Sequence, residues 1–136
     1  MFRSLLVKAR TGHEIKLVVP ARSNHPVTDR ARRYYLRELK AAGVEVLLYQ
    51  PGMMHSKGMI VDDRVGLLGS ANFDMRSLFV NFEIGVFVYS EPEVAAMRAW
   101  AEDLIARSVP MPPEREHRRL LGNITEDLSR LFAPML

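Results

Sequence analysis

The chain of 136 residues is 48% hydrophobic and 26% charged, with a net charge of +3 at neutral pH. This composition is that of a globular protein, and the length suits one domain with its own core. The absence of cysteine excludes disulfides and thiolate chemistry. No apolar run approaches the ~18 residues that a membrane span needs, and no signal-peptide pattern follows Met1, so we expect a cytoplasmic protein without a transmembrane segment.

Positive charge is concentrated towards the N-terminus. The first 43 residues contain ten Lys and Arg against three Asp and Glu, a balance of +7, whereas the remainder carries −4. A basic flank indicates anionic partners, either the phosphodiester backbone of nucleic acid or anionic lipid headgroups. The alternative is an ordinary solvated helix face with surface lysines.

The first third of the chain predicts helix and strand in alternation. Residues 1–11 are expected to form a helix that ends at Gly12, and residues 14–19 alternate like a strand. Thr28 can cap a second helix, because its side chain accepts a hydrogen bond from a free backbone N–H group. The apolar residues of this helix fall on one stripe: Ala31, Tyr35, Leu39 and Ala42.

Gly43 is expected to end the second helix, and residues 44–49 to form the next strand. A strand–helix–strand unit of this kind forms parallel sheet. The fold class predicted is therefore α/β, with a mixed, largely parallel sheet flanked by helices.

Two strands after Pro51-Gly52 carry polar residues at regular intervals. Side chains of a strand alternate between its faces, so His55 and Lys57 project to one side while apolar residues continue the strand. Residues 62–64 predict a turn, and residues 65–68 a returning apolar strand. An imidazole and an ammonium group thus lie near the start of a hairpin.

Ser70 and Asn72 share parity after the returning strand. They add a hydroxyl and an amide to the imidazole and the ammonium group, which is a set suited to binding and attacking a phosphate. Beyond them, residues 81–89 predict a last strand. Ser90 and Glu93 predict a capping box for a helix that runs to about residue 107.

Prolines at 110, 112 and 113 predict a rigid joint. We expect a catalytic half-domain over residues 1–109 and a helical tail over residues 110–136 that packs on it. The Leu-rich tail is more typical of such packing than of adsorption to a membrane.

The spacing of His55, Lys57 and Asp62 is H-x-K-x4-D, followed by G-S-A-N over 69–72 and by a downstream glutamate. A chance match at seven specified positions is very improbable. The chain resembles the phospholipase D superfamily. Residues 49–89 most resemble the second catalytic half of bacterial cardiolipin synthases.

The resemblance implies a phosphoryl-transfer site built on one histidine from each of two halves. A neutral imidazole can attack phosphorus, and a protonated one can donate to the leaving alkoxide, so two are needed. In the family one histidine becomes a phosphohistidine, and this chain supplies only His55. Lys57, Ser70 and Asn72 are expected to bind the phosphoryl oxygens.

Glu83 occupies the downstream acidic position of the family, where it is expected to accept a hydrogen bond from the other ring nitrogen of His55. Asp62 belongs to the signature of catalytic residues. Its parity on the strand is opposite to that of His55, so its role is interpreted as structural. No metal or other cofactor is implied, because His55 has no neighbouring set of His, Cys or carboxylate ligands.

The leading functional hypothesis is a phosphatidyltransferase of the cardiolipin synthase type, acting on phosphatidylglycerol at the surface of the inner membrane. A second H-x-K half would come from homodimerisation or from a longer parent chain. One alternative is a homodimeric nuclease or phosphodiesterase, and only under this alternative is nucleic acid a partner. The other is an inactive half. Cardiolipin synthases carry two halves, so we expect an N-terminally truncated half-domain.

Overall fold

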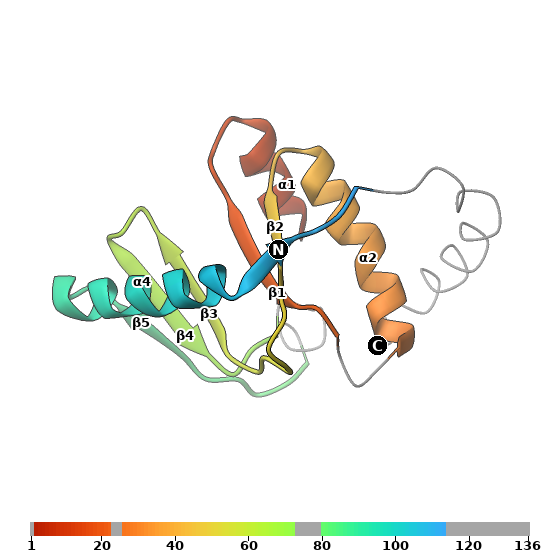
Figure 1. Cartoon of the computed structure of the whole chain (residues 1–136). Helices are drawn as coiled ribbons and strands as arrows, with labels where there is room; N and C mark the ends of the chain where they lie inside the picture. The colour runs from red at the N-terminus through yellow and green to blue at the C-terminus, as the bar shows by residue number, and fades with distance from the viewer. Residues whose placement is uncertain (1, 23–25, 73–79, 114–136) are drawn as a thin grey trace, which may run out of the picture.

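The computed structural model describes residues 2–22, 26–72 and 80–113 (Figure 1). The elements are α1 (Phe2–Arg10), β1 (Lys16–Pro20), α2 (Pro26–Ala41), β2 (Glu45–Tyr49), β3 (Lys57–Val61), β4 (Val65–Gly69), β5 (Gly85–Val88), α4 (Glu91–Ala106) and β6 (Ser108–Pro110). They form two three-stranded sheets, ordered β1-β2-β6 and β3-β4-β5.

The first sheet contains the predicted strand–helix–strand unit. Strands β1 and β2 are parallel and joined through α2, as expected, and β6 pairs antiparallel with β2. The helix ends where the sequence predicted, because Gly43 adopts a left-handed φ of 101° that other residues rarely take. It begins earlier than predicted, at Pro26 instead of after Thr28, because proline is well suited to the first turn of a helix.

The main core lies between the first sheet and the helices α1 and α2. It consists of Leu6, Ala9, Leu36, Leu39, Val44 and Val46. Of the predicted apolar stripe, Leu39 is buried and Tyr35 is half-buried, with its ring centroid 5.0 Å from that of Phe2. Burial of these apolar side chains holds the two helices on the sheet.

The second sheet is an antiparallel meander packed against α4. Gly58 and Gly66 leave room for this helix: a Cβ atom at Gly58 would lie 3.2 Å from the Trp100 ring, and one at Gly66 would lie 2.4 Å from the sulfur of Met97. The expected helix is present and ends at Ala106. The predicted capping box is not formed, because the Ser90 side chain makes no cap hydrogen bond with the backbone. Its hydroxyl instead donates to the Glu93 carboxylate and lowers the pKa of Glu93.

The α/β class with mixed strand directions is confirmed, but the parallel share is smaller than predicted. Only β1 and β2 are parallel among the four pairs in the described residues. For β3 and β4 the reason is connection length, because the short turn over residues 62–64 can join only antiparallel neighbours. Strand β6 was not predicted, since Pro110 suggested a joint; an edge strand tolerates proline.

Residues 114–136, where a helical tail was predicted, lie outside the described part of the chain. None of the helices in the described part is both long enough and apolar enough to cross a bilayer.

Candidate functional site

The candidate site residues other than Asp62 lie at one end of the second sheet or on the connections at that end. Lys57, the first residue of β3, lies opposite Gly69, the last residue of β4, and Gly69 lies opposite Gly85, the first residue of β5. Residues that precede β3, follow β4 and precede β5 are therefore neighbours in space. This register is what brings three separated parts of the sequence to one place.

His55 and Lys57 lie together, as predicted, although His55 precedes β3, which begins only at Lys57, and so is not a strand residue as expected. The Lys57 ammonium nitrogen is 2.9 Å from Nδ1 and 3.3 Å from Nε2 of the His55 ring, and it donates to the His55 carbonyl oxygen at 2.7 Å. The imidazole is exposed and can be approached from solvent. A phosphate that reached the ring would have a fixed positive charge beside it.

Gly69 permits the close approach that places Ser70. A Cβ atom at Gly69 would lie 2.6 Å from the carbonyl oxygen of Ile84, which is backbone and cannot move aside easily. Because this space is free, the Ser70 amide donates to the Ile84 carbonyl at 2.9 Å, and the Ile84 amide donates to the Ser70 hydroxyl at 3.0 Å. The loop after β4 is thus tied to the residues before β5.

Glu83 lies in a small hydrogen-bonded group with Ser70. The Ser70 hydroxyl donates to Oε2 of Glu83 at 2.5 Å, and the Asn81 amide donates to Oε1 at 3.4 Å. The carboxylate is half-buried and therefore fixed in place. Sequence reasoning gave Asn81 no role; the only signal was its position two residues before Glu83.

Asn72 is exposed beyond the end of β4. Its place on the same connection as Ser70 agrees with the predicted grouping. The contact with phosphate that we expect of it stays a prediction.

Asp62 lies at the opposite end of the hairpin. It is five residues beyond Lys57 on β3, a separation of about 16 Å at the usual rise of a strand. Asp62 and Asp63 both have positive φ angles, 52° and 53°, so they form the turn between β3 and β4. This placement agrees with the structural interpretation of Asp62. It separates Asp62 from His55 and Lys57, which we call the His55 group together with Ser70 and Glu83.

The turn is also held by charge. Asp63 accepts a hydrogen bond from Arg98 of α4 at 2.6 Å, and Arg98 pairs with Glu102 one turn later. The hydrogen bond to Glu102 and the charge of Asp63 raise the pKa of Arg98.

Among the described residues, no three His, Cys, Asp or Glu side chains are grouped as metal ligands.

Comparison with known proteins shows the family of the chain. A family model described as "Cardiolipin synthase, PLD-like domain" matches residues 1–105. The chain belongs to this family of PLD-like domains. The chain is 33% identical over its whole length to cardiolipin synthase A of Yersinia pseudotuberculosis, of which it covers 28%.

A second relative is the cardiolipin synthase of Geobacillus kaustophilus, 34% identical over 98% of this chain and 27% of the relative. The chain thus spans little more than a quarter of the length of these proteins. Its fold is similar to that of Nuc from Salmonella typhimurium, a phospholipase D family member. That match has a TM-score of 0.73 and 19% identity, over 82% of this chain and 73% of the other.

Proposed function

We propose that the chain is a catalytic half-domain of a phosphatidyltransferase of the cardiolipin synthase type. The observation that carries the proposal is the group at the end of the second sheet, where Lys57 contacts His55 and Ser70 holds Glu83. The similarity to cardiolipin synthases over the whole chain supports the same reaction. The substrate proposed is phosphatidylglycerol, and the product cardiolipin.

In the first step, a ring nitrogen of neutral His55 attacks the phosphorus of one phosphatidylglycerol. A P–N bond forms, the P–O bond to the headgroup glycerol breaks, and the leaving alkoxide takes a proton from a second imidazolium. Lys57 stabilises the negative charge that develops on the non-bridging oxygens. Its ammonium group is already in place, because it lies against the His55 ring. Ser70 and Asn72 would add hydrogen bonds.

In the second step, a headgroup hydroxyl of another phosphatidylglycerol attacks the phosphohistidine. The second imidazole takes its proton, the P–N bond breaks, and His55 is regenerated. Glu83 is proposed to accept a hydrogen bond from the His55 ring and so to fix its tautomer. Its bonds from Ser70 and Asn81 support this role, because they hold the carboxylate in one orientation.

The second imidazole is proposed to come from another half, either a second copy or part of a longer chain. The chain would act at the surface of the inner membrane, where its substrates lie. The excess of basic residues in the first 43 positions supports attraction to anionic lipid.

A homodimeric nuclease or general phosphodiesterase is the second candidate. The single H-x-K-x4-D motif and the basic first third favour it. Binding to nucleic acid by such a protein weakens steeply as salt is raised. A chain that binds DNA no better at low than at high salt would count against this candidate.

The decisive experiment measures attack by His55 on a substrate whose leaving group needs no acid, so that no second histidine is required. A phosphodiester with a p-nitrophenolate leaving group needs no acid, so His55 alone should form the phosphohistidine. We expect a stoichiometric burst of p-nitrophenolate in the presence of a chelator, no burst from His55→Ala, and a full burst from the exposed control His13→Ala. A parent chain without a burst would contradict the proposed nucleophile.

Cardiolipin formation on phosphatidylglycerol vesicles tests the whole reaction. If two copies share one site, activity of mixtures with His55→Ala should fall with the square of the parent fraction. A linear fall would mean that each copy acts alone. No turnover despite a burst would place the second histidine in another polypeptide or in a longer chain.

A further inference from the structure

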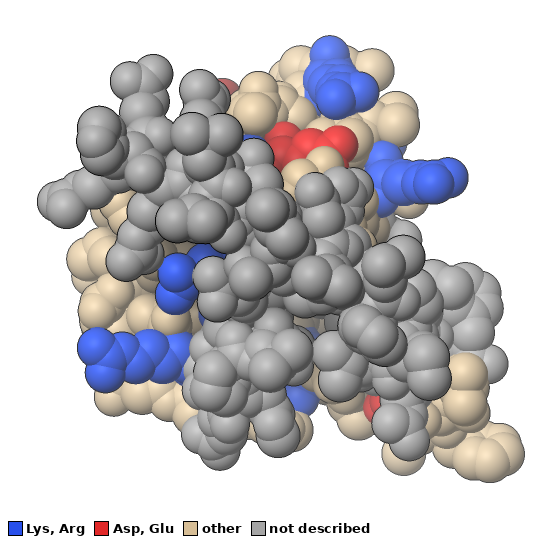
Figure 2. Space-filling model, turned by 90° about the vertical axis from the view of Figure 1, so that its right-hand side faces the viewer, with Lys and Arg blue, Asp and Glu red and all other residues tan. Residues whose placement is uncertain are grey.

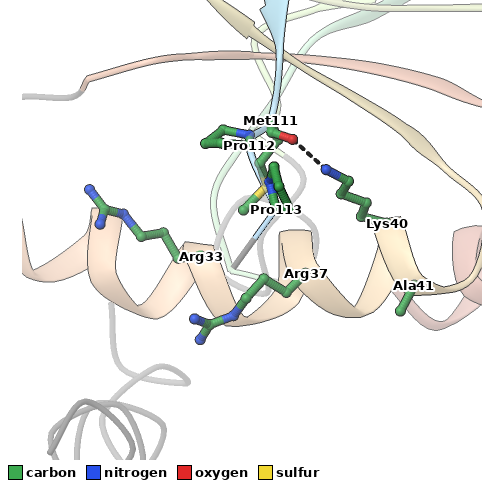
Figure 3. Close-up of a pocket in the computed structure, with 7 residues that line it drawn as sticks. All are labelled: Arg33, Arg37, Lys40, Ala41, Met111, Pro112 and Pro113. Atoms are coloured by element: carbon green, nitrogen blue, oxygen red, sulfur yellow. Dashed lines mark hydrogen bonds between the residues drawn. The ribbon is translucent and has the colours of Figure 1, made fainter. Parts of the chain in front are cut away.

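The two sheets differ in how their faces are covered. Helices α1 and α2 pack on one face of the first sheet through the main core, and α4 contacts β2 and β6 as well. Leu47, whose side chain points to the face opposite that of Val46, is also buried. The segment that follows β6 is tied to α2, because Lys40 donates to the Met111 carbonyl oxygen (Figure 3). The first sheet is therefore covered on both faces.

The second sheet is covered by α4 on one face. Gly58 and Gly66 identify this face, because a Cβ atom at these positions would lie against Trp100 and Met97 of α4. The residues next to them in β3 and β4 point the opposite way, since the side chains of a strand alternate. The strand register places these apolar side chains on the opposite face, which we call the open face: Met59, Val61, Val65, Leu67 and Phe87, with Tyr89 directly after β5.

The open face exposes apolar side chains where a solvated sheet face is usually polar. Phe87 and Tyr89 are 59% and 68% exposed, and their rings stack with an interplanar angle of 17°. Val61 is 44% exposed. Figure 2 shows a different surface on the side that bears α2, where the charged side chains in view are mostly Lys and Arg. We therefore expect the open face to bind an apolar ligand.

A cation lies on the same side of the sheet as the open face. Lys57 is the first residue of β3 and has the same parity as Met59, and its ammonium group lies against the His55 ring. In the three described strands of this sheet, the side of the open face carries no Asp or Glu. The surface thus combines a positive charge at the site end with apolar side chains along the strands.

This combination selects the kind of ligand. An anion with a long apolar part matches it, because the anion can lie at Lys57 while the apolar part lies along the strands. The five residues of β3 extend over about 16 Å, close to the depth of one leaflet of a bilayer core, about 15 Å. The same face of a second copy would bring no carboxylate to Lys57. A soluble phosphodiester would leave the apolar side chains in water.

We propose that the open face binds the acyl chains of the phosphatidyl group whose phosphodiester lies at His55 and Lys57. This inference rests on the proposed function, which puts the phosphodiester at this end of the sheet. It makes Phe87 and Tyr89 specificity residues that favour a phospholipid over a soluble phosphodiester. Phe87 is two residues from Gly85, about 7 Å, and Tyr89 is four residues from it, about 13 Å, so Tyr89 would contact only longer chains.

Isothermal titration calorimetry of the His55→Ala chain, which cannot react, measures ligand binding alone. The probes are monomeric dihexanoylphosphatidylglycerol and glycerophosphoglycerol, which has the same headgroup without acyl chains. We expect the lipid to bind at least about tenfold more tightly, because the burial of each methylene group contributes about fourfold in affinity. Equal affinities of the two probes would overturn the proposal.

Substitutions on the two faces of β5 test where the acyl chains lie. Phe87→Ser should weaken binding of the lipid at least about fivefold and leave binding of glycerophosphoglycerol unchanged. The matched control is Val86→Ser, because Val86 is 55% exposed on the same strand but points to the side of α4. It should bind the lipid within about twofold of the parent. Equal losses in the two variants would overturn the assignment to the open face.

Tyr89→Ser is a second variant, and it leaves the residues of β5 unchanged. With dioctanoylphosphatidylglycerol below its critical micelle concentration, it should weaken binding at least about threefold. With the shorter dihexanoyl lipid, the loss should be less than about twofold. An effect of Tyr89→Ser that did not depend on chain length would contradict the proposed path of the acyl chains along the strands.

Two further outcomes separate this inference from others. Weaker self-association of Phe87→Ser with unchanged lipid binding would give the open face to a second copy and overturn the lipid assignment. If the lipid bound as expected but the parent chain gave no p-nitrophenolate burst, the acyl site would be supported and the proposed nucleophile contradicted. Failure of the inference and failure of the proposed function are thus distinguishable.

Discussion

Ser70 connects the loop after β4 to the acidic residue of the site. Its hydroxyl donates to Glu83 and accepts from the Ile84 amide, so one side chain fixes both a carboxylate and the backbone beside it. Hydrogen bonds to charged groups contribute about 1.5–3 kcal/mol each. At the residue scale, Ser70 therefore positions Glu83, in addition to the contact with phosphate that we propose for it.

We predict that Ser70→Ala lowers the rate of the p-nitrophenolate burst by about tenfold, because the Glu83 carboxylate loses a charge-assisted hydrogen bond. Stopped-flow absorbance measures the rate. The control is Ser56→Ala, an exposed serine between His55 and Lys57, which should react like the parent. If the Ser70→Ala chain reacted as fast as the parent, the hydrogen bond from Ser70 to Glu83 would not be needed for the burst.

At the scale of elements, the two ends of the hairpin β3–β4 differ: one lies beside the proposed catalytic residues, and the other is a tight turn. The His55 group lies at one end, and the turn of Asp62 and Asp63 lies at the other, with both residues in the left-handed region. Short polar side chains tolerate this conformation better than branched apolar ones. The aspartate of the signature is thus explained by the turn.

Asp62→Asn should keep the burst within about threefold of the parent, because asparagine also tolerates a left-handed φ. Asp62→Val should lower the free energy of unfolding by about 1–2 kcal/mol, since a β-branched residue is strained at this φ. Urea unfolding and burst kinetics measure the two effects. A loss of burst in a stable Asp62→Asn chain would restore a chemical role to Asp62.

The contact between α4 and β4 offers a second prediction. Gly66→Ala should lower the free energy of unfolding by about 1–3 kcal/mol, because its Cβ would overlap the Met97 side chain. In Met97→Ala chains the same substitution should cost less, since the overlapping atoms are gone. Gly85→Ala is the control, because its Cβ would meet only Leu67, at 3.4 Å. Additive costs would contradict the contact.

At the scale of the whole molecule, β5 forms an edge of the second sheet and exposes many apolar side chains. Residues in and beside this strand are more than half exposed: Val80, Phe82, Ile84, Val86, Phe87 and Tyr89. The rings of Phe87 and Tyr89 stack with centroids 6.3 Å apart. Exposed apolar edge strands promote association between chains.

We predict that the purified chain self-associates with rising concentration and that Phe87→Lys weakens this association by about tenfold or more, because a charge opposes edge pairing. Sedimentation velocity measures the association. Val7→Lys is a matched control, because Val7 is also 59% exposed but lies on α1. Equal effects of the two variants would mean that β5 is not the associating surface.

The sequence alone determined the local elements and the membership of the site. Periodicity and the helix-ending glycines predicted α1, α2 and β2, and Ser90 with Glu93 predicted α4, because these signals act over a few residues. The H-x-K spacing predicted that His55 and Lys57 lie on one side, and they are in contact, because two residues so close in the sequence need little help from the rest of the fold; His55 itself precedes β3.

Only the tertiary structure decided how separated segments meet. The pairing of Ser70 with Glu83 depends on the register of β4 against β5, and no local pattern specifies a register across a loop. The same holds for β6, which is a strand only because β2 provides a partner. The contact of Lys40 with Met111 likewise depends on packing, because the two residues are 71 positions apart in the sequence. Contacts of this kind depend on how the elements pack. The sequence pattern indicated which residues were candidates for the site, but not which of them meet.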